Sequence, residues 1–82
     1  MRVPTIHLNG TSKERLLEAL EEAYQAITAA QLKLSEAAPN GRDYYPQGPD
    51  VILEAVHEHN ARVQKLEDVK KEIEHICEAI GA

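Results

Sequence analysis

The sequence predicts an all-α protein: an antiparallel two-helix hairpin with a short extended N-terminal arm, assembled into an oligomeric helical bundle. Two long segments carry apolar residues at alternating steps of four and three, the spacing of a helix that keeps one stripe against a partner. A proline- and glycine-rich stretch separates them. The chain has 82 residues and no Phe or Trp. Two lone helices cannot cover both sides of such stripes, so association is favoured.

Residues 1–10 form the expected arm. The run Val3–Leu8 is typical of an extended segment, and Asn9-Gly10 is a turn signal. Pro4 has no backbone N–H and excludes a central strand position. We expect the apolar residues of the arm to lie across the helices or to pair with a neighbouring subunit.

The first helix is predicted over about residues 12–37. Thr11-Ser-Lys-Glu14 matches a capping box at its start, and Pro39-Asn40-Gly41 stops it. Further alanines widen its apolar face beyond a two-helix seam, which indicates more than one neighbour. The predicted seam residues are Leu16, Leu20, Ala23, Ile27, Ala30, Leu34 and Ala37.

The second helix is predicted over about residues 50–80, with Pro49 at its first position and Gly81 at its end. Glu58–Arg62 and Glu67–Lys71 are i,i+4 pairs that mark the expected solvated face. The predicted seam residues are Ile52, Val56, His59, Val63, Leu66, Val69, Ile73, Ile76 and Ile80, with Cys77 beside them.

Composition narrows the classes of partner. A net charge of −5 argues against nucleic acid, because nucleic-acid-binding proteins usually present a basic stripe. The single Cys77 permits no internal disulfide and is expected to be a buried structural thiol in a reducing cytosol. No apolar run approaches the roughly 20 residues of a membrane span. We therefore expect a cytoplasmic protein with no membrane partner.

Histidines raise two questions of chemistry. Glu54-Ala-Val-His57 and Glu72-Ile-Glu-His75 have the Glu-x-x-His spacing of bundle metal ligands, but helical geometry turns them away from the seam. A solvated charged face is therefore preferred over a metal site, and no cofactor is predicted. His59 occupies a seam position, where it either fixes register or contacts a ligand.

No catalytic arrangement is recognisable. The Ser and Thr residues fall in capping or surface settings, and neither a G-x-S-x-G motif nor a phosphate-cradling glycine loop is present. The chain is therefore predicted not to be an enzyme.

The stretch 38–49 is the expected recognition element, because helix hairpins need only a few connecting residues. Arg42 offers a planar fork of donors for phosphate or carboxylate. Tyr44 and Tyr45 offer flat faces for stacking a base. Asn40 and Asp43 supply polar contacts. The structural alternative is that the tyrosines seal the open end of the bundle and the prolines stiffen the turn.

The segment Ala-Ala-Pro-Asn-Gly-Arg-Asp-Tyr-Tyr-Pro-Gln-Gly-Pro-Asp, residues 37–50, together with its flanking helices resembles small uncharacterised proteins of tailed phages and prophages. More loosely, a compact helical hairpin of this origin is similar to the sponge proteins that phages use against CBASS and Thoeris immunity. That likeness implies an oligomer whose pockets sequester cyclic nucleotides or ADP-ribose-type signals without degrading them. It carries no residue roles.

The expected function is that of a non-catalytic phage accessory protein, an oligomeric binder that sequesters a nucleotide-type host immune signal. The ligand-binding residues are predicted to be Arg42, Tyr44, Tyr45, Asn40, Asp43 and His59. The alternative is a protein-interaction module that inhibits a host defence protein or a phage protein by direct binding. It would use an acidic face of the first helix: Glu14, Glu18, Glu21 and Glu22. A metal-binding bundle through the two Glu-x-x-His pairs is the third reading.

Overall fold

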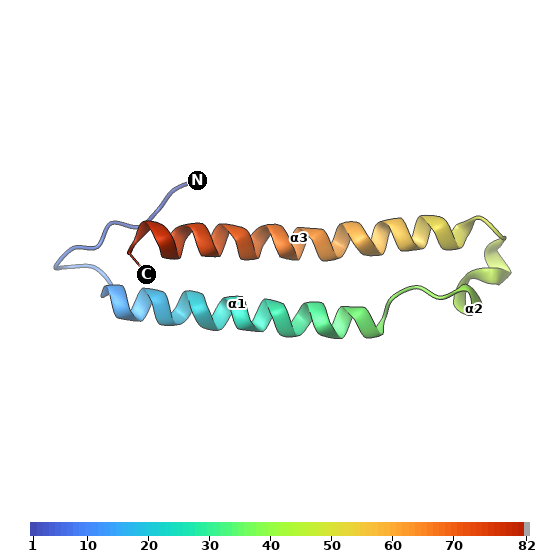
Figure 1. Ribbon diagram of the computed structural model, residues 1–82, viewed down its shortest axis with the longest axis horizontal. Coiled ribbons are helices and arrows are strands. Elements are labelled where there is room, and N and C mark those ends of the chain that lie inside the picture. The colour runs from blue at the N-terminus through green and yellow to red at the C-terminus, as the bar shows by residue number, and fades with distance from the viewer. Residues whose placement is uncertain (82) are drawn as a thin grey trace.

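The computed structural model describes residues 1–81, and its regular elements are all helical, with no strand in that range. They are α1 (Lys13–Glu36), α2 (Gly41–Tyr44), the 3₁₀ helix η1 (Tyr45–Gln47) and α3 (Val51–Ala79). α1 and α3 lie side by side and in opposite directions along a body of 60 × 21 × 17 Å, with the short elements at one end and both termini at the other (Figure 1). The predicted all-α class is confirmed.

Local chemistry sets the ends of the long helices. Ser12, in an extended conformation, caps α1 by accepting a hydrogen bond from the Arg15 amide at 3.2 Å. The capping box predicted from Thr11 is therefore wrong by one residue. Pro49 is also not the first residue of α3, which begins at Val51 after a turn. At the other end Gly81 adopts a φ of 95°, a left-handed conformation that glycine reaches readily, as its predicted role as a stop requires.

The predicted loop at 38–49 is largely folded. Asn40 caps α2 by accepting a hydrogen bond from the Asp43 amide, and η1 follows directly. These elements contact the first turns of α3. The connection is thus a compact cap on one end of the helix pair.

The N-terminal arm contains the predicted turn, but the apolar residue at the tip of that turn does not pack on the helices. The Gly10 amide donates to the His7 carbonyl at 3.2 Å and closes the turn. Leu8 at its apex is 98% exposed, so the expectation that it lies across the helices is wrong. Its pairing with a neighbouring subunit stays a prediction.

The contact between the long helices is rotated from the predicted seam. Leu20, Ile27 and Leu34 face α3 as expected, but Ala23, Ala30 and Ala37 are exposed; Tyr24 and Gln31 take part in the contact instead. On α3, Ala55 and Lys70 are buried, whereas the predicted seam residues Val56 and Val69 are exposed. The physical reason is a set of polar contacts from Tyr24 and Gln31 to α3, described below.

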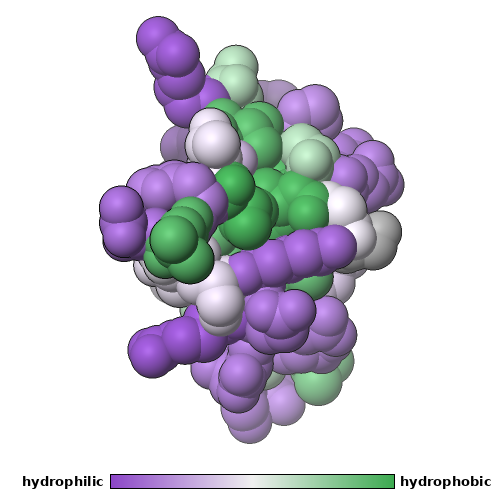
Figure 2. All heavy atoms as spheres, turned by 90° about the vertical axis from the view of Figure 1, so that its left-hand side faces the viewer, coloured by the Kyte–Doolittle hydropathy of each residue, from purple (hydrophilic) through white to green (hydrophobic). Residues whose placement is uncertain are grey.

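The apolar core is thin. Among residues 1–81 no side chain is completely enclosed, and the buried apolar residues are Ala55, Ile73 and Ile80. Figure 2 shows apolar side chains open to the surface at the end of the molecule that holds the termini. Within the described part of the chain, no helix is both long enough and apolar enough to cross a bilayer.

Candidate functional site

The end of the molecule capped by α2 and η1 contains a polar hollow of about 270 Å³. The end of α1, the cap and the first three turns of α3 all contribute to it. We call it the loop-end hollow. Its lining residues are Ala37, Pro39, Tyr44, Gln47, Val51, Glu54, Ala55, Glu58, His59 and Arg62.

Two predicted ligand-binding residues meet in this hollow. Tyr44 lies half-buried on α2, and His59 lies on α3, where it is 9% exposed. The position of His59 is compatible with both of its predicted roles, because it lies in the contact between the helices and also lines an accessible hollow. Residues fifteen positions apart in sequence are brought together because α2 folds back onto the start of α3.

Asn40 and Asp43 are engaged with each other. The Asn40 Nδ2 donates to the Asp43 Oδ2 at 2.9 Å, and the Asn40 Oδ1 accepts from the Asp43 backbone amide at 3.2 Å. This reciprocal pair stabilises the start of α2, and neither residue lines the hollow. The geometry therefore supports a structural role for both.

Arg42 and Tyr45 also lie outside the lining of the hollow. Tyr45 is 75% exposed, so it does not seal the end of the bundle, although the half-buried Tyr44 partly does. Arg42 is exposed on the outer side of the cap.

Sequence reasoning missed the role of three charged residues. Glu54, Glu58 and Arg62 follow one another at i,i+4 spacing on α3, and all three line the hollow. Glu58 and Arg62 are exposed, as the prediction of a solvated face requires, and they border the hollow as well. Ala55 and His59 directly follow the two glutamates in sequence and are buried against the other elements of the fold. This adjacency is the signal that could have placed the glutamates near the hollow.

The hollow combines complementary polar groups. Arg62 and His59 are cationic or hydrogen-bond donors, whereas Glu54 and Glu58 accept hydrogen bonds from N–H and hydroxyl groups. Tyr44 adds an aromatic ring and a phenolic hydroxyl. Such a set suits a small molecule that carries both a limited negative charge and several donors.

A second polar cluster, which we call the bridged flank, connects the middle of α1 to α3. The Lys70 Nζ donates to the Gln31 Oε1 at 3.0 Å and lies 3.8 Å from the Glu67 Oε2. The Gln31 Nε2 in turn donates to the same Glu67 oxygen at 2.9 Å. The Tyr24 hydroxyl donates to the Glu74 Oε1 at 2.8 Å.

Lys70 is the centre of this cluster and is only 8% exposed. Besides its polar partners, its Nζ lies 4.7 Å from the centre of the Tyr24 ring, a cation–π distance. The predicted pairing of Glu67 with Lys71 is replaced by the contact with Lys70. A buried ammonium with three partners constrains how α1 and α3 align.

Ionisation within the cluster is perturbed. The hydrogen bond to Glu74, and then burial, raise the pKa of Tyr24 above its usual value of 10.0. The hydrogen bond from Gln31, and then the Lys70 ammonium, lower the pKa of Glu67 below its usual value of 4.5.

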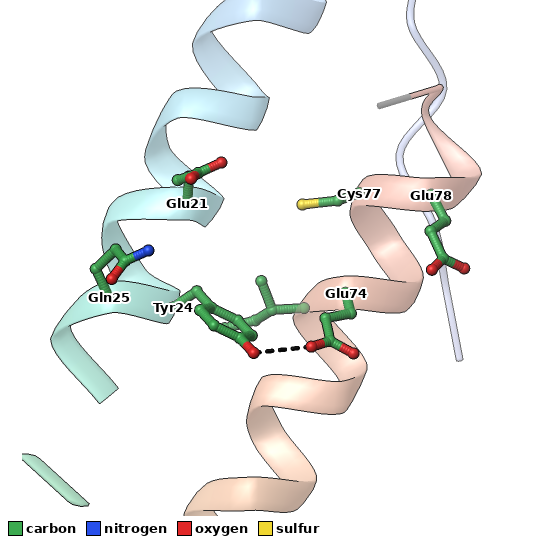
Figure 3. A pocket seen from close by; sticks show the side chains of 7 residues that line it. Glu21, Tyr24, Gln25, Glu74, Cys77 and Glu78 are labelled. Carbon is green, nitrogen blue, oxygen red and sulfur yellow. Dashed lines mark hydrogen bonds between the residues drawn. The ribbon is translucent and has the colours of Figure 1, made fainter. Parts of the chain in front are cut away.

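Beside the bridged flank, nearer the termini, lies a second hollow of about 280 Å³ (Figure 3). Glu21, Glu74 and Glu78 give it an acidic rim, and Cys77 points toward α1. Cys77 is half-buried, so the expectation of a buried thiol is only partly met.

The two Glu-x-x-His pairs are not assembled into a metal site. In residues 1–81 no three His, Cys, Asp or Glu side chains are grouped closely enough to hold a metal ion. His57, Glu72 and His75 are exposed, and Glu54 belongs to the loop-end hollow.

Comparison with known proteins gives no relative: no protein-family model, curated protein or solved structure matches this chain.

Proposed function

We propose that the chain is a non-catalytic binding protein that takes up a nucleotide-type small molecule in the loop-end hollow. We also propose that it works as a homo-oligomer of antiparallel helical hairpins. The supporting observation is that Tyr44 of α2 meets His59 and Arg62 of α3 at one accessible polar space.

Each side chain has a role in this proposal. Tyr44 stacks on the base, since base–aromatic stacking tolerates any base. Arg62, which lines the hollow, holds a phosphate through its forked donors in place of Arg42, which does not. Glu54 and Glu58 accept hydrogen bonds from ribose hydroxyls or from the base edge. His59 donates the remaining hydrogen bond to phosphate.

The charges of the residues that line the hollow restrict the class of ligand that it can bind. Two carboxylates beside one guanidinium repel a highly charged triphosphate but admit a less charged group, such as a phosphodiester with one negative charge or a diphosphate bridge with two. A cyclic nucleotide or an ADP-ribose derivative therefore fits better than a nucleoside triphosphate. On the resemblance to phage proteins, this ligand would be a host immune signal that the protein sequesters in the bacterial cytosol.

The proposal assigns the hollow a binding role. The residues described as lining it include no serine, threonine or cysteine. Sequestration requires only affinity, and the stacking and charge-assisted contacts above supply it.

Titration calorimetry with a panel of cyclic mono- and dinucleotides and ADP-ribose derivatives tests the proposal. We expect one class to bind and Arg62→Gln to weaken it at least tenfold, which is about 1.4 kcal/mol. Arg42→Gln is the matched control, because this arginine lies outside the hollow, and it should bind as the wild type does. No binding across the panel, or equal losses in both variants, would contradict the proposal.

A second candidate function is direct binding of a basic protein by the acidic face of α1. The observation in its favour is that Glu14, Glu18, Glu21 and Glu22 are all exposed. Glu21 also meets Glu74 and Glu78 around the second hollow, which extends the acidic surface onto α3. Salt-sensitive capture of a basic host protein, lost in Glu18→Lys and retained in Arg62→Gln, would favour this candidate.

A further inference from the structure

The helix pair has a second flank, opposite the bridged one, and most of its residues are exposed or only half-buried within residues 1–81, although Ala55 is buried. Residues seven apart on a helix lie on the same face, so each helix contributes one row to this flank. The hollow confirms that the two rows share a side, because Ala37 of one row and Ala55 and Arg62 of the other line it together. This alanine flank consists of Leu16, Ala23 and Ala30 on α1, Ala37 directly after α1, and Ala55, Arg62, Val69 and Ile76 on α3.

The alanine flank has the composition of an interface core. Arg62 is its only charged member, and charged residues are depleted at the centre of interfaces. Ala23, Ala30 and Ala37 are exposed in the single chain, and Val69 is 41% exposed. Small side chains let a neighbouring helix approach closely.

The surface area of the chain indicates how much is left to cover. A compact protein of 9.1 kDa exposes about 4,900 Å², but this chain exposes 6357 Å². The excess of about 1,500 Å² falls in the range of roughly 1,000–2,500 Å² that each subunit of an obligate homodimer buries. The radius of gyration is likewise 18.3 Å, against about 12 Å for a compact chain of this length.

We propose that a second copy of this chain packs on the alanine flank to form a dimeric four-helix bundle. A second copy is the expected partner because a two-fold axis places the same apolar flank of each chain against that of the other. Both flanks are then covered, and the assembly closes at two chains. The proposal specifies the oligomer of the proposed function and does not depend on the ligand.

This placement has a consequence for the site. The loop-end hollow opens beside the same flank, because Ala37, Ala55 and Arg62 belong to both. A partner seated there walls one side of the hollow, and the two-fold axis makes two equivalent hollows per dimer. Bound ligand should then appear at two molecules per dimer.

Two neighbouring alanines test the interface. Ala30 belongs to the alanine flank, whereas Ala29 lies 100° further around α1, and both are exposed in the single chain. We expect light scattering to give the wild type a mass of two chains. Ala30→Arg should raise the dimer dissociation constant at least a hundredfold, and Ala29→Arg should leave it unchanged. Arginine is a good helix former, so neither change opposes α1 itself.

Each outcome decides the proposal. A wild type of one-chain mass, an Ala30→Arg variant that keeps the wild-type mass, or equal effects of the two variants would overturn it. If Ala30→Arg instead loses its helical circular dichroism while Ala29→Arg keeps it, the proposal stands, because exposed Ala30 supports the fold only through a partner. A dimer that behaves as expected but binds no ligand would reject the proposed function alone.

Discussion

The two flanks of the helix pair differ in how fully their side chains are hydrogen-bonded or buried. On the bridged flank, Tyr24, Gln31 and Lys70 join α1 to α3 through hydrogen bonds, and no polar partner is missing. On the alanine flank, small and branched apolar side chains remain open to solvent. The comparison shows that the alignment of α1 with α3 and the burial of their apolar surface depend on different flanks of the helix pair. Polar contacts within the chain set the alignment, and the proposed second copy would bury the alanine flank.

The largest effect is expected at Ile73, one of the buried apolar residues of the core. Ile73→Ala removes most of a core side chain and should lower the free energy of unfolding by about 3 kcal/mol. Leu32→Ala is the control, because Leu32 is exposed on the outer face of α1 and its loss should cost less than about 0.5 kcal/mol. Urea unfolding at one protein concentration measures both, and equal losses would contradict the described contact between the helices.

A smaller effect should come from breaking the bridged flank alone. Gln31→Leu removes an acceptor from the buried Lys70 ammonium and should cost about 2 kcal/mol. The double variant Gln31→Leu, Lys70→Leu should regain most of that loss, since apolar residues of similar size replace a buried polar pair well. A double variant that is less stable than the single one would show that the contacts of Lys70 with Glu67 and the Tyr24 ring stabilise the fold more than the apolar pair does.

The smallest effects concern the pH dependence of the same flank. Because the pKa of Glu67 is lowered in the folded protein, its contribution is present above pH 4.5 and is lost as the pH falls from there through the folded pKa. Glu67→Gln should flatten the acid side of the stability profile. The flank would play no part in this dependence if the profile were unchanged.

Tyr24 should act at the opposite end of the pH range. Its pKa is raised, so its contribution is complete below pH 10.0 and is lost as the pH rises through the folded pKa. Tyr24→Phe should remove that alkaline loss, whereas Tyr45→Phe, on an exposed ring, should not. Thermal unfolding between pH 8 and 11 would distinguish the two variants.

Sequence pattern located the helices well but located the site only in part. The helix ends agree within a few residues because caps, prolines and glycines act on their immediate neighbours. Tyr44 and His59 were identified because an aromatic in a long connection and a polar residue in a seam are each unusual where they stand. Arg62 was missed because its i,i+4 spacing to Glu58 is equally typical of a solvated face.

The sequence by itself determined that this chain forms two long helices, a long connection between them and a shared central layer that includes Leu20, Ile27 and Ile73. Only the tertiary structure decided on which side of that layer contacts within the chain join α1 to α3. Periodicity is a property of one helix, and the apolar face of α1 extended over both flanks. The choice was made by contacts of Gln31 and Tyr24 with Glu67, Lys70 and Glu74, which lie 36 to 50 positions away along the chain. A buried ammonium is stable only where its partners converge.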